Sequence, residues 1–287
     1  MGKLITKDVR KTFTIRPSGR STDFISPSFG YGCLYNCSYC YMKRHKDKGL
    51  SIAVNTGDIL TEINNHAYFT PVDKPNQTHA EYTTYDISCN EDFALHAKYH
   101  DWQRIFEFFR DHPVAMGSFA TKFVNPELIN FDPKGKIRIR FSLMPQHKSD
   151  LHEPGTSKII DRIKAIDAFI EAGYDVHVNY SPIIVYDGWL QDYEYIFDMM
   201  NDYVSYKNQV LAECIFLTHN FKKHTVNLDR HPETEVDLWV IDKQEIKKSQ
   251  YGGENVRYKL GEKSKYIKQF RQIHESKVPW NTIRYIF

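Results

Sequence analysis

The chain has few cysteines, no long apolar run and almost no net charge. Only five of its 287 residues are cysteine, which excludes the disulfide framework of a small secreted protein and indicates a reducing cytosol. No apolar segment approaches membrane-spanning length, and the first residues lack the apolar core of a signal peptide. The net charge of +2 means that any affinity for nucleic acid must come from local basic patches. These absences predict a cytoplasmic protein with no membrane partner.

What is present is the composition of a globular α/β protein. Hydrophobic residues make up 41% of the chain and aromatic residues 14%, which is ample for a large core. Between residues 22 and 218, strand-like segments alternate with helix-like ones. The predicted strands cover 22–29, 81–88, 114–120, 136–144, 176–185 and 210–218, and the predicted helices cover 58–69, 101–110, 126–130, 157–172 and 190–204.

This alternation predicts a parallel sheet that curls into a barrel. Six strand–helix units in succession favour a partial (β/α)6 TIM-like barrel, in which catalytic groups lie at the carboxyl ends of the strands. From about residue 229 the alternation stops, and a basic segment contains the hairpin signal Gly252-Gly253. We therefore expect a barrel over 1–228 and a C-terminal β-hairpin/α extension over 229–287 that packs on the barrel.

The strongest local motif is a run of three closely spaced cysteines after the first predicted strand. Cys33, Cys37 and Cys40 have Cx3Cx2C spacing. A cubane [4Fe–4S] cluster has four irons, so three cysteines leave one iron open to chelate a small molecule. A zinc knuckle and a disulfide loop are the alternatives. Zinc needs a fourth ligand, and the first candidate, His45, follows five residues later in a stretch rich in Lys and Arg.

A fourth cysteine, Cys89, ends the second predicted strand in a polar run. A lone cysteine is usually an inert part of a core. At the catalytic end of a barrel strand, however, a thiol can donate a hydrogen atom, so both interpretations stand for Cys89. Cys214 lies midway along the apolar sixth strand, where we expect a core residue.

The fourth predicted strand carries charged residues on one of its two faces. Its apolar residues alternate with Lys136, Arg138, Arg140 and Ser142, so the polar set should face the barrel lumen. Buried arginines need partners. Either they pair with carboxylates of neighbouring strands, or they bind a polar ligand.

Taken together, the chain resembles spore photoproduct lyase and its relatives in the radical S-adenosylmethionine (SAM) superfamily. Tyr39 and Tyr41 on both sides of the last clustered cysteine carry the resemblance, together with Cys89. The segment before the cluster is shorter than in those lyases. Further matches are Ser88-Cys89-Asn90-Glu91-Asp92, Thr121-Lys122, Arg140-Phe141-Ser142, Glu171-Ala172-Gly173-Tyr174, and Pro182 through Gly188-Trp189, with a weaker echo at Arg257-Tyr258.

The resemblance implies cofactors and roles for these residues. The clustered cysteines would hold a [4Fe–4S] cluster that cleaves SAM to a 5′-deoxyadenosyl radical, which abstracts a hydrogen from a thymine-derived base. Cys89 would return a hydrogen atom to the thymine radical, with Tyr39 and Tyr41 as the relay. The residues expected to contact SAM are Tyr39, Asn90, Lys122 and Ser142.

The function expected from the resemblance is lyase repair of a thymine photolesion in DNA. The base must be flipped out or single-stranded to enter a barrel, and an electron donor such as flavodoxin or ferredoxin is needed. The basic hairpin either binds phosphates or forms a solvated face through Lys247, Lys248, Arg257 and Lys259.

One alternative function is radical SAM rearrangement or hypermodification of a modified pyrimidine in DNA or a nucleotide, for example by a virus-encoded enzyme. Another is a non-catalytic iron–sulfur protein that binds nucleic acid.

Overall fold

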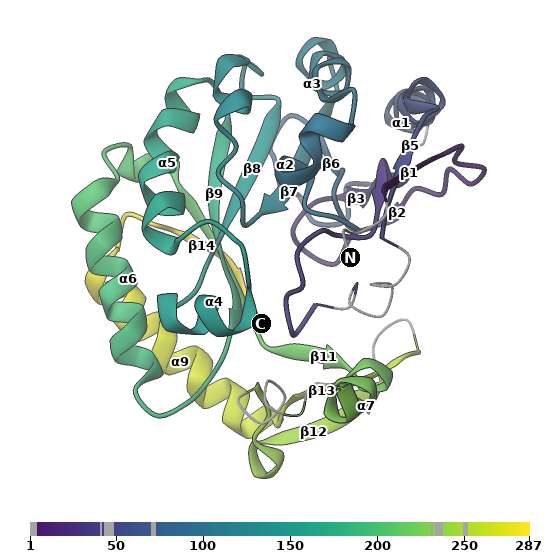
Figure 1. Cartoon of the computed structure of the whole chain (residues 1–287). Helices are drawn as coiled ribbons and strands as arrows, with labels where there is room; N and C mark the ends of the chain where they lie inside the picture. The colour runs from purple at the N-terminus through teal and green to yellow at the C-terminus, as the bar shows by residue number, and fades with distance from the viewer. Residues whose placement is uncertain are drawn as a thin grey trace.

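A curled eight-stranded sheet forms the centre of the molecule, with the strand order β14-β10-β9-β8-β7-β6-β3-β2 (Figure 1). The computed structural model describes residues 5–40, 42, 49–69, 73–230, 232, 238–248 and 252–287. The strands of this sheet are β2 (Arg16–Pro17), β3 (Phe24–Ile25), β6 (Thr83–Asp86), β7 (Ala115–Thr121), β8 (Ile137–Leu143), β9 (Asp175–Ile183), β10 (Leu211–Phe216) and β14 (Ile283–Ile286).

The six strands β3, β6, β7, β8, β9 and β10 are parallel neighbours and correspond to the six predicted strands. The predicted α/β half-barrel is therefore confirmed. The first strand is much shorter than predicted, because only Phe24 and Ile25 pair with β6. Asp23, just before them, is instead tied to β6 by its side chain, which accepts hydrogen bonds from the Thr84 backbone and hydroxyl at 3.0 and 2.8 Å. Pro27, just after them, has no N–H to continue the ladder.

Helices cover the outer face of the curled sheet (Figure 1). In α5, Ile159, Ile163, Ile166 and Phe169 recur at helical spacing and are fully buried in the core. The outer helices are α1 (Thr56–Phe69), α3 (Trp102–Asp111), α5 (Ile159–Glu171) and α6 (Trp189–Tyr203). Shorter elements lie in the loops: α2 (Phe93–His96), α4 (Gln146–His152) and 3-10 turns at Ala97–Tyr99, Pro126–Asn130, Lys207–Gln209 and Ile241–Lys243.

Two small sheets flank the barrel. One has the order β1-β5-β4, from β1 (Ile5–Asp8), β5 (Leu50–Ala53) and β4 (Gly30–Tyr31). The other is antiparallel, with the order β11-β13-β12, from β11 (Thr218–Asn220), β13 (Glu254–Tyr258) and β12 (Gln244–Lys248). The arms of the predicted basic hairpin are β12 and β13, while 249–251 lie outside the described residues.

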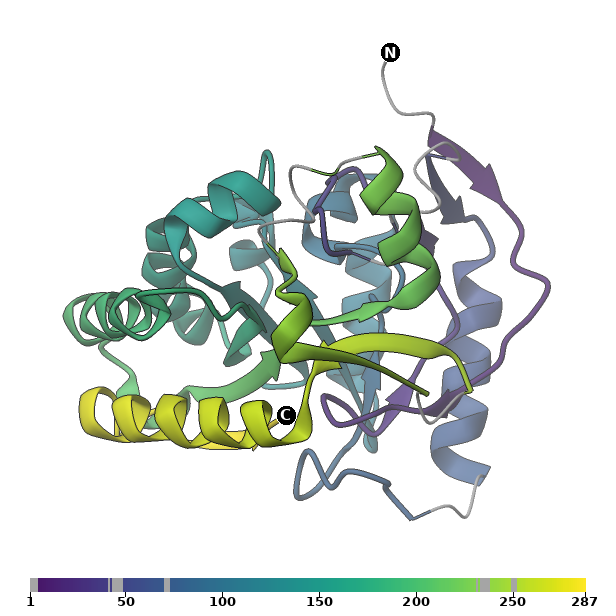
Figure 2. The same ribbon diagram turned by 90° about the horizontal axis from the view of Figure 1, so that it is seen from below.

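The C-terminal part of the chain adds to the barrel itself. Helix α9 (Leu260–Lys277) packs on α6, and β14 then adds a parallel strand beside β10. Figure 2 shows α9 along one side of the barrel and α7 (Phe221–Arg230) above the small C-terminal sheet. Among the described residues, no helix has both the length and the apolar composition that crossing a membrane requires.

The charged face of β8 is paired inside the barrel. Arg138 Nε lies 2.7 Å from an Asp175 oxygen, and Arg140 lies 2.7 Å from Asp86 and 3.5 Å from Glu213. Burial alone would raise the pKa of Glu213, but Arg140, His177 and Arg284 outweigh it and lower this pKa to about 2. Both arginines are therefore paired with carboxylates of other strands, Arg138 with one on the adjacent β9 and Arg140 with two on β6 and β10. Arg140 also lines a cavity of the barrel, so a contact with a polar ligand stays a prediction for this residue.

Candidate active site

A cavity of about 420 Å³ opens at the carboxyl ends of the barrel strands. Its wall combines the cysteine loop, the loop after β6, the end of β7 and residues 215–220 at the end of β10. The structure thereby brings together six of the residues that the sequence predicted for the site: Cys33, Cys37, Tyr39, Cys40, Cys89 and Lys122.

Hydrogen bonds from distant segments fix the cysteine loop at Ser38 and Tyr39. The Ser38 N–H donates to the His152 carbonyl at 2.9 Å, and the Ser38 hydroxyl hydrogen-bonds to His152 Nδ1 at 2.7 Å. From α7, the Asn227 amide donates to the Ser38 carbonyl at 2.9 Å, and from β11 the His219 ring donates to the Tyr39 carbonyl at 3.1 Å. Residues of α4, β11 and α7 therefore hold the cysteine loop in place together.

The loop after β6 supports the cysteine loop from the other side. Glu91 is fully buried and lies 2.9 Å from both His96 Nδ1 and His100 Nε2. Because His96 Nε2 accepts a hydrogen bond from the Leu34 N–H at 3.2 Å, its Nδ1 carries the proton and donates to Glu91. Burial would raise the pKa of Glu91, but His100 and His96 lower it to about 2. This carboxylate orients a histidine that holds the cysteine loop in place.

The three clustered thiols fit a cluster better than a single metal ion. None of them forms a disulfide, and burial, followed by the charges of Asp92 and Cys40, raises the pKa of Cys33 to about 12. Among the described residues, no three His, Cys, Asp or Glu side chains gather closely enough to hold one ion. A cubane binds each thiolate on a different iron, so its ligands stand further apart than those of zinc. His45 lies outside the described residues.

Lys122 reaches the cavity from the end of β7. The Asp92 carboxylate positions it by accepting hydrogen bonds from the Lys122 N–H at 2.8 Å and from the Thr121 hydroxyl at 2.7 Å. Lys122 Nζ donates to Ser142 Oγ at 3.5 Å and lies 3.8 Å from Glu153. Burial alone would lower the pKa of Lys122, but the negative charges of Glu153, Cys37 and Asp92 together outweigh it and raise this pKa. The ammonium group therefore stays charged beside the thiols.

A buried network around Glu153 joins Lys122 to the cysteine loop. The Tyr39 hydroxyl donates a hydrogen bond to Glu153, whose other oxygen lies 3.0 Å from Arg162. Arg162 also donates to the Ser142 carbonyl at 2.7 Å, and the side chains of Glu153 and Arg162 are fully buried. Burial, followed by the charge of Glu153, raises the pKa of Tyr39 well above its usual value. Tyr39 therefore faces the cavity as a neutral phenol.

This network predicts a large loss of stability when its central charge is removed. Glu153→Gln leaves two cations without their carboxylate, so the free energy of unfolding should fall by about 3–5 kcal/mol in chemical denaturation. Asp150→Asn is the matched control, because the Asp150–Lys158 pair is exposed and should contribute less than about 1 kcal/mol. If the free energy of unfolding fell equally in Glu153→Gln and Asp150→Asn, the buried network would not stabilise the fold as predicted.

Two residues predicted to contact SAM are not part of the cavity wall. Ser142 is buried behind Lys122 and meets it at 3.5 Å. The Asn90 amide donates to Ser28 Oγ at 2.5 Å and lines a neighbouring cavity of about 290 Å³. Tyr41 lies outside the described residues, and Cys214 is fully buried in the core, as expected.

The sequence analysis assigned no role to Glu91, Glu153, Arg162, His219 or Asn227. Glu153, His219 and Asn227 left no local signal, because each contacts the cysteine loop more than 100 residues away in the sequence. The only available signal was the position of Glu91 two residues after Cys89.

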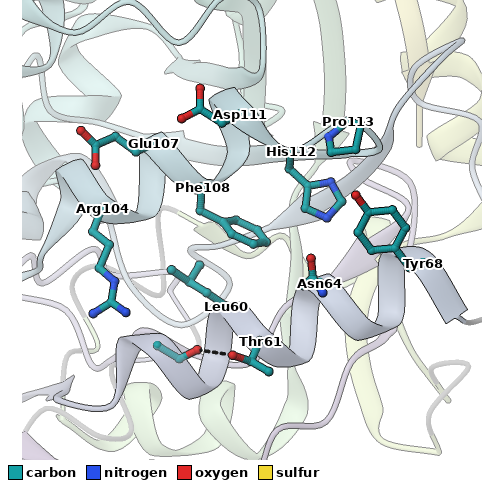
Figure 3. A pocket seen from close by; sticks show the side chains of 11 residues that line it. Leu60, Thr61, Asn64, Tyr68, Arg104, Glu107, Phe108, Asp111, His112 and Pro113 are labelled. Carbon is teal, nitrogen blue, oxygen red and sulfur yellow. Dashed lines mark hydrogen bonds between the residues drawn. The ribbon is translucent and has the colours of Figure 1, made fainter.

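A larger cavity, of about 590 Å³, lies between α1 and α3 on the outside of the barrel (Figure 3). Figure 3 shows Arg104 and His112 near opposite ends of this groove, with Leu60 and Phe108 between them. Its lining contains no cysteine, so the chemistry suggested by the cysteine motif belongs to the smaller cavity.

Comparisons with known proteins show which family the sequence matches. The sequence model of the spore photoproduct lyase family matches residues 3–287. Spore photoproduct lyase of Bacillus subtilis (strain 168) is 28% identical over 274 residues, covering 93% of this chain and 74% of that protein. Spore photoproduct lyase of Geobacillus sp. (strain Y412MC61) is 26% identical over 277 residues, covering 93% and 75%.

The fold also matches solved structures. A double mutant of spore photoproduct lyase with bound AdoMet and dinucleoside spore photoproduct superposes with a TM-score of 0.87. The match has 22% sequence identity and covers 99% of this chain and 82% of that chain. With the family match extending over nearly the whole sequence, the chain belongs to the spore photoproduct lyase family.

Proposed function

We propose that this chain is a radical SAM lyase that repairs spore photoproduct, a thymine lesion, in DNA. One observation carries the proposal: three clustered cysteines without disulfides, a charged lysine and a fourth thiol, Cys89, line a single cavity at the catalytic end of a half-barrel. Membership of the spore photoproduct lyase family supports it. So does the relative whose structure contains AdoMet and dinucleoside spore photoproduct.

The cofactors are a [4Fe–4S] cluster and SAM. Cys33, Cys37 and Cys40 would hold the cluster, and Lys122 with Ser142 would hold the carboxylate or amino group of SAM, with Asn90 and Tyr39 nearby. When bound, this pair supplies a carbon-centred radical that removes a hydrogen atom from the substrate. The protein itself binds and orients the cofactors and the substrate, and it excludes water from the cavity. Ile215, Phe216, Leu217 and Pro182 give the cavity an apolar side suited to this task.

Cys89 is the proposed hydrogen donor to the thymine radical, and Tyr39 and Tyr41 the proposed relay. Cys89 and Tyr39 line the same cavity, so a product radical held there faces both. In the free protein the Tyr39 hydroxyl is bonded to Glu153, which fixes the ring beside Lys122. A relay through Tyr39 therefore begins from a phenol that a buried carboxylate orients.

The expected partners are DNA and a small electron carrier such as flavodoxin or ferredoxin, in a reducing cytoplasm where free thiols persist. A thymine inside a duplex cannot enter the cavity, so the lesion must be flipped out or single-stranded.

The proposed domain organisation is a barrel over 1–228 and an extension over 229–287. On the hairpin, Lys247 lies 3.0 Å from Glu245, while Lys248 is exposed.

The decisive experiment is anaerobic incubation of the reconstituted protein with SAM, a reductant and an oligonucleotide that contains spore photoproduct. Mass spectrometry should detect 5′-deoxyadenosine and the restored thymines. A rearranged or enlarged pyrimidine in their place would favour base hypermodification. Binding of DNA with no SAM cleavage under any of these conditions would favour a non-catalytic iron–sulfur protein.

Lys122 offers a test of the SAM site. Lys122→Ala should weaken SAM binding by about 10- to 100-fold, because a charge-assisted hydrogen bond contributes about 1.5–3 kcal/mol. Equilibrium binding of SAM to the anaerobic protein measures this, and thermal unfolding checks that the variant is folded. Lys158→Ala, which removes an exposed lysine on a neighbouring segment, is the control. Unchanged affinity in Lys122→Ala would remove Lys122 from the SAM site.

A further inference from the structure

Three cations from separate parts of the chain meet at one place on the surface. Arg20 lies between β2 and β3, Arg257 lies in β13, and Lys263 lies in the first turn of α9. Burial, followed by repulsion from Arg257 and Arg20, lowers the pKa of Lys263. A positive charge is also unfavourable in the first turn of a helix. The fold therefore gathers like charges where they repel one another.

The side chain of Phe287 holds two of these cations together. The Arg20 guanidinium lies 4.5 Å and Lys263 Nζ 5.5 Å from the centre of the Phe287 ring. The ring is fixed in turn, because the Phe287 N–H donates to the Cys214 carbonyl at 3.0 Å and its carbonyl accepts from the Phe216 N–H at 2.8 Å. The arrangement is built into the end of the sheet.

These cations differ from the arginines in the barrel lumen, which are paired. Neither the Arg20 nor the Lys263 side chain makes a hydrogen bond or ion pair with another described residue, and Arg257 approaches Glu245 only to 4.0 Å. The terminal carboxyl group of Phe287 also lies beside these cations, but it forms an ion pair with neither Arg20 nor Lys263. A compact group of cations, two of which have unpaired side chains, is suited to an external anion.

Two independent connections link the group to the wall of the catalytic cavity. Arg257 is the ladder partner of Thr218 in the β11–β13 pair, and Thr218 lines the cavity. Phe287 is hydrogen-bonded to Phe216, which also lines the cavity. In Figure 2 the loop between β2 and β3 and the chain's C-terminus lie side by side, as the Arg20–Phe287 contact requires.

We propose that Arg20 and Lys263, together with Arg257, bind backbone phosphates of the DNA that flanks the lesion. This inference rests on the proposed function and extends it from the lesion to its surroundings. When the damaged bases occupy the cavity, the phosphates next to them lie outside it, and this group of cations adjoins the cavity wall at Thr218 and Phe216. Arginine and lysine contacts to phosphates position a nucleic acid without reading its sequence.

The test uses the variants Arg20→Gln, Lys263→Gln and their combination in the full-length protein. Lys164→Gln is the matched control, because Lys164 also lies over an aromatic ring, that of Tyr203, but on the outer helices. Fluorescence anisotropy with a lesion-free single-stranded oligonucleotide is recorded over a range of salt concentrations. Each lost phosphate contact should weaken binding and reduce the slope of log affinity against log salt by about 0.7.

The double variant should therefore bind the oligonucleotide more weakly, and its slope should fall by about twice that amount, while Lys164→Gln keeps the wild-type affinity and slope. The double variant should also prefer a lesion within an oligonucleotide over the dinucleoside lesion less strongly than wild type does, because the dinucleoside lacks flanking phosphates. Wild-type affinity and slope in the double variant would overturn the inference. If the unaltered protein repairs neither form of the lesion, the proposed function itself fails, whatever the salt dependence.

Discussion

Cys89→Ala should still cleave SAM and consume the lesion, yet lose nearly all of the intact thymine product. The reason is the position of the thiol: Cys89 lines the cavity with Tyr39 and the clustered cysteines, where a product radical would be quenched. Without its hydrogen donor, the thymine radical should react with solvent species and give aberrant adducts. Mass spectrometry of the digested oligonucleotide measures both the thymine and the adducts.

The control for this variant is Cys214→Ala, which removes a thiol that is fully buried in the core. It should retain normal product. A rearrangement that regenerates the adenosyl radical has no need of a thiol donor. Clean product from Cys89→Ala would therefore falsify the hydrogen-donor role and favour hypermodification of a base. SAM binding must be measured in parallel, because Cys89 lies in the same cavity as Lys122.

Cys37→Ala should abolish activity altogether. Cys37 is the most buried of the three clustered cysteines, with 7% of its surface exposed, and its removal leaves only two thiols in the loop. Anaerobically reconstituted wild-type protein should contain about four irons per chain, as one [4Fe–4S] cluster requires. The variant should contain far less iron, lack the charge-transfer absorbance of a cluster and release no 5′-deoxyadenosine.

Cys214→Ala again serves as the control, and here it should retain a full complement of iron. The opposing result is a wild-type protein that binds stoichiometric zinc and shows no charge-transfer absorbance. That outcome would restore the zinc-knuckle interpretation of the Cx3Cx2C spacing and remove the basis for radical chemistry.

The alternation of strands and helices could be predicted from the sequence because it depends on local periodicity. The apolar residues of α5 recur at helical spacing, and β8 alternates between apolar and charged residues, so each element and its buried face could be predicted. The cysteine motif is equally local, since three ligands within eight residues need no distant partner to be recognised. Its position after the first strand followed from the barrel topology.

The tertiary structure decided how the site residues are held and charged. Which carboxylates neutralise Arg140 depends on the neighbouring strands, and Asp86 and Glu213 lie far from it in the sequence. Glu153 likewise meets Tyr39 across 114 residues. Such pairings leave no periodic signal, because the energy of a buried charge depends on what surrounds it in space.

The group of Arg20, Arg257 and Lys263 beside the cavity wall also depends on both the sequence and the fold. Local sequence placed Lys263 in a basic segment, but gave no reason to join it to Arg20 near the other end of the chain. Only the curling of the sheet brings Arg20 and Lys263 to the same Phe287 ring. The sequence by itself determined the elements, the cysteine motif and the family. The tertiary structure determined which charges are neutralised inside the protein and which remain available to a ligand, because that depends on distances that only folding sets.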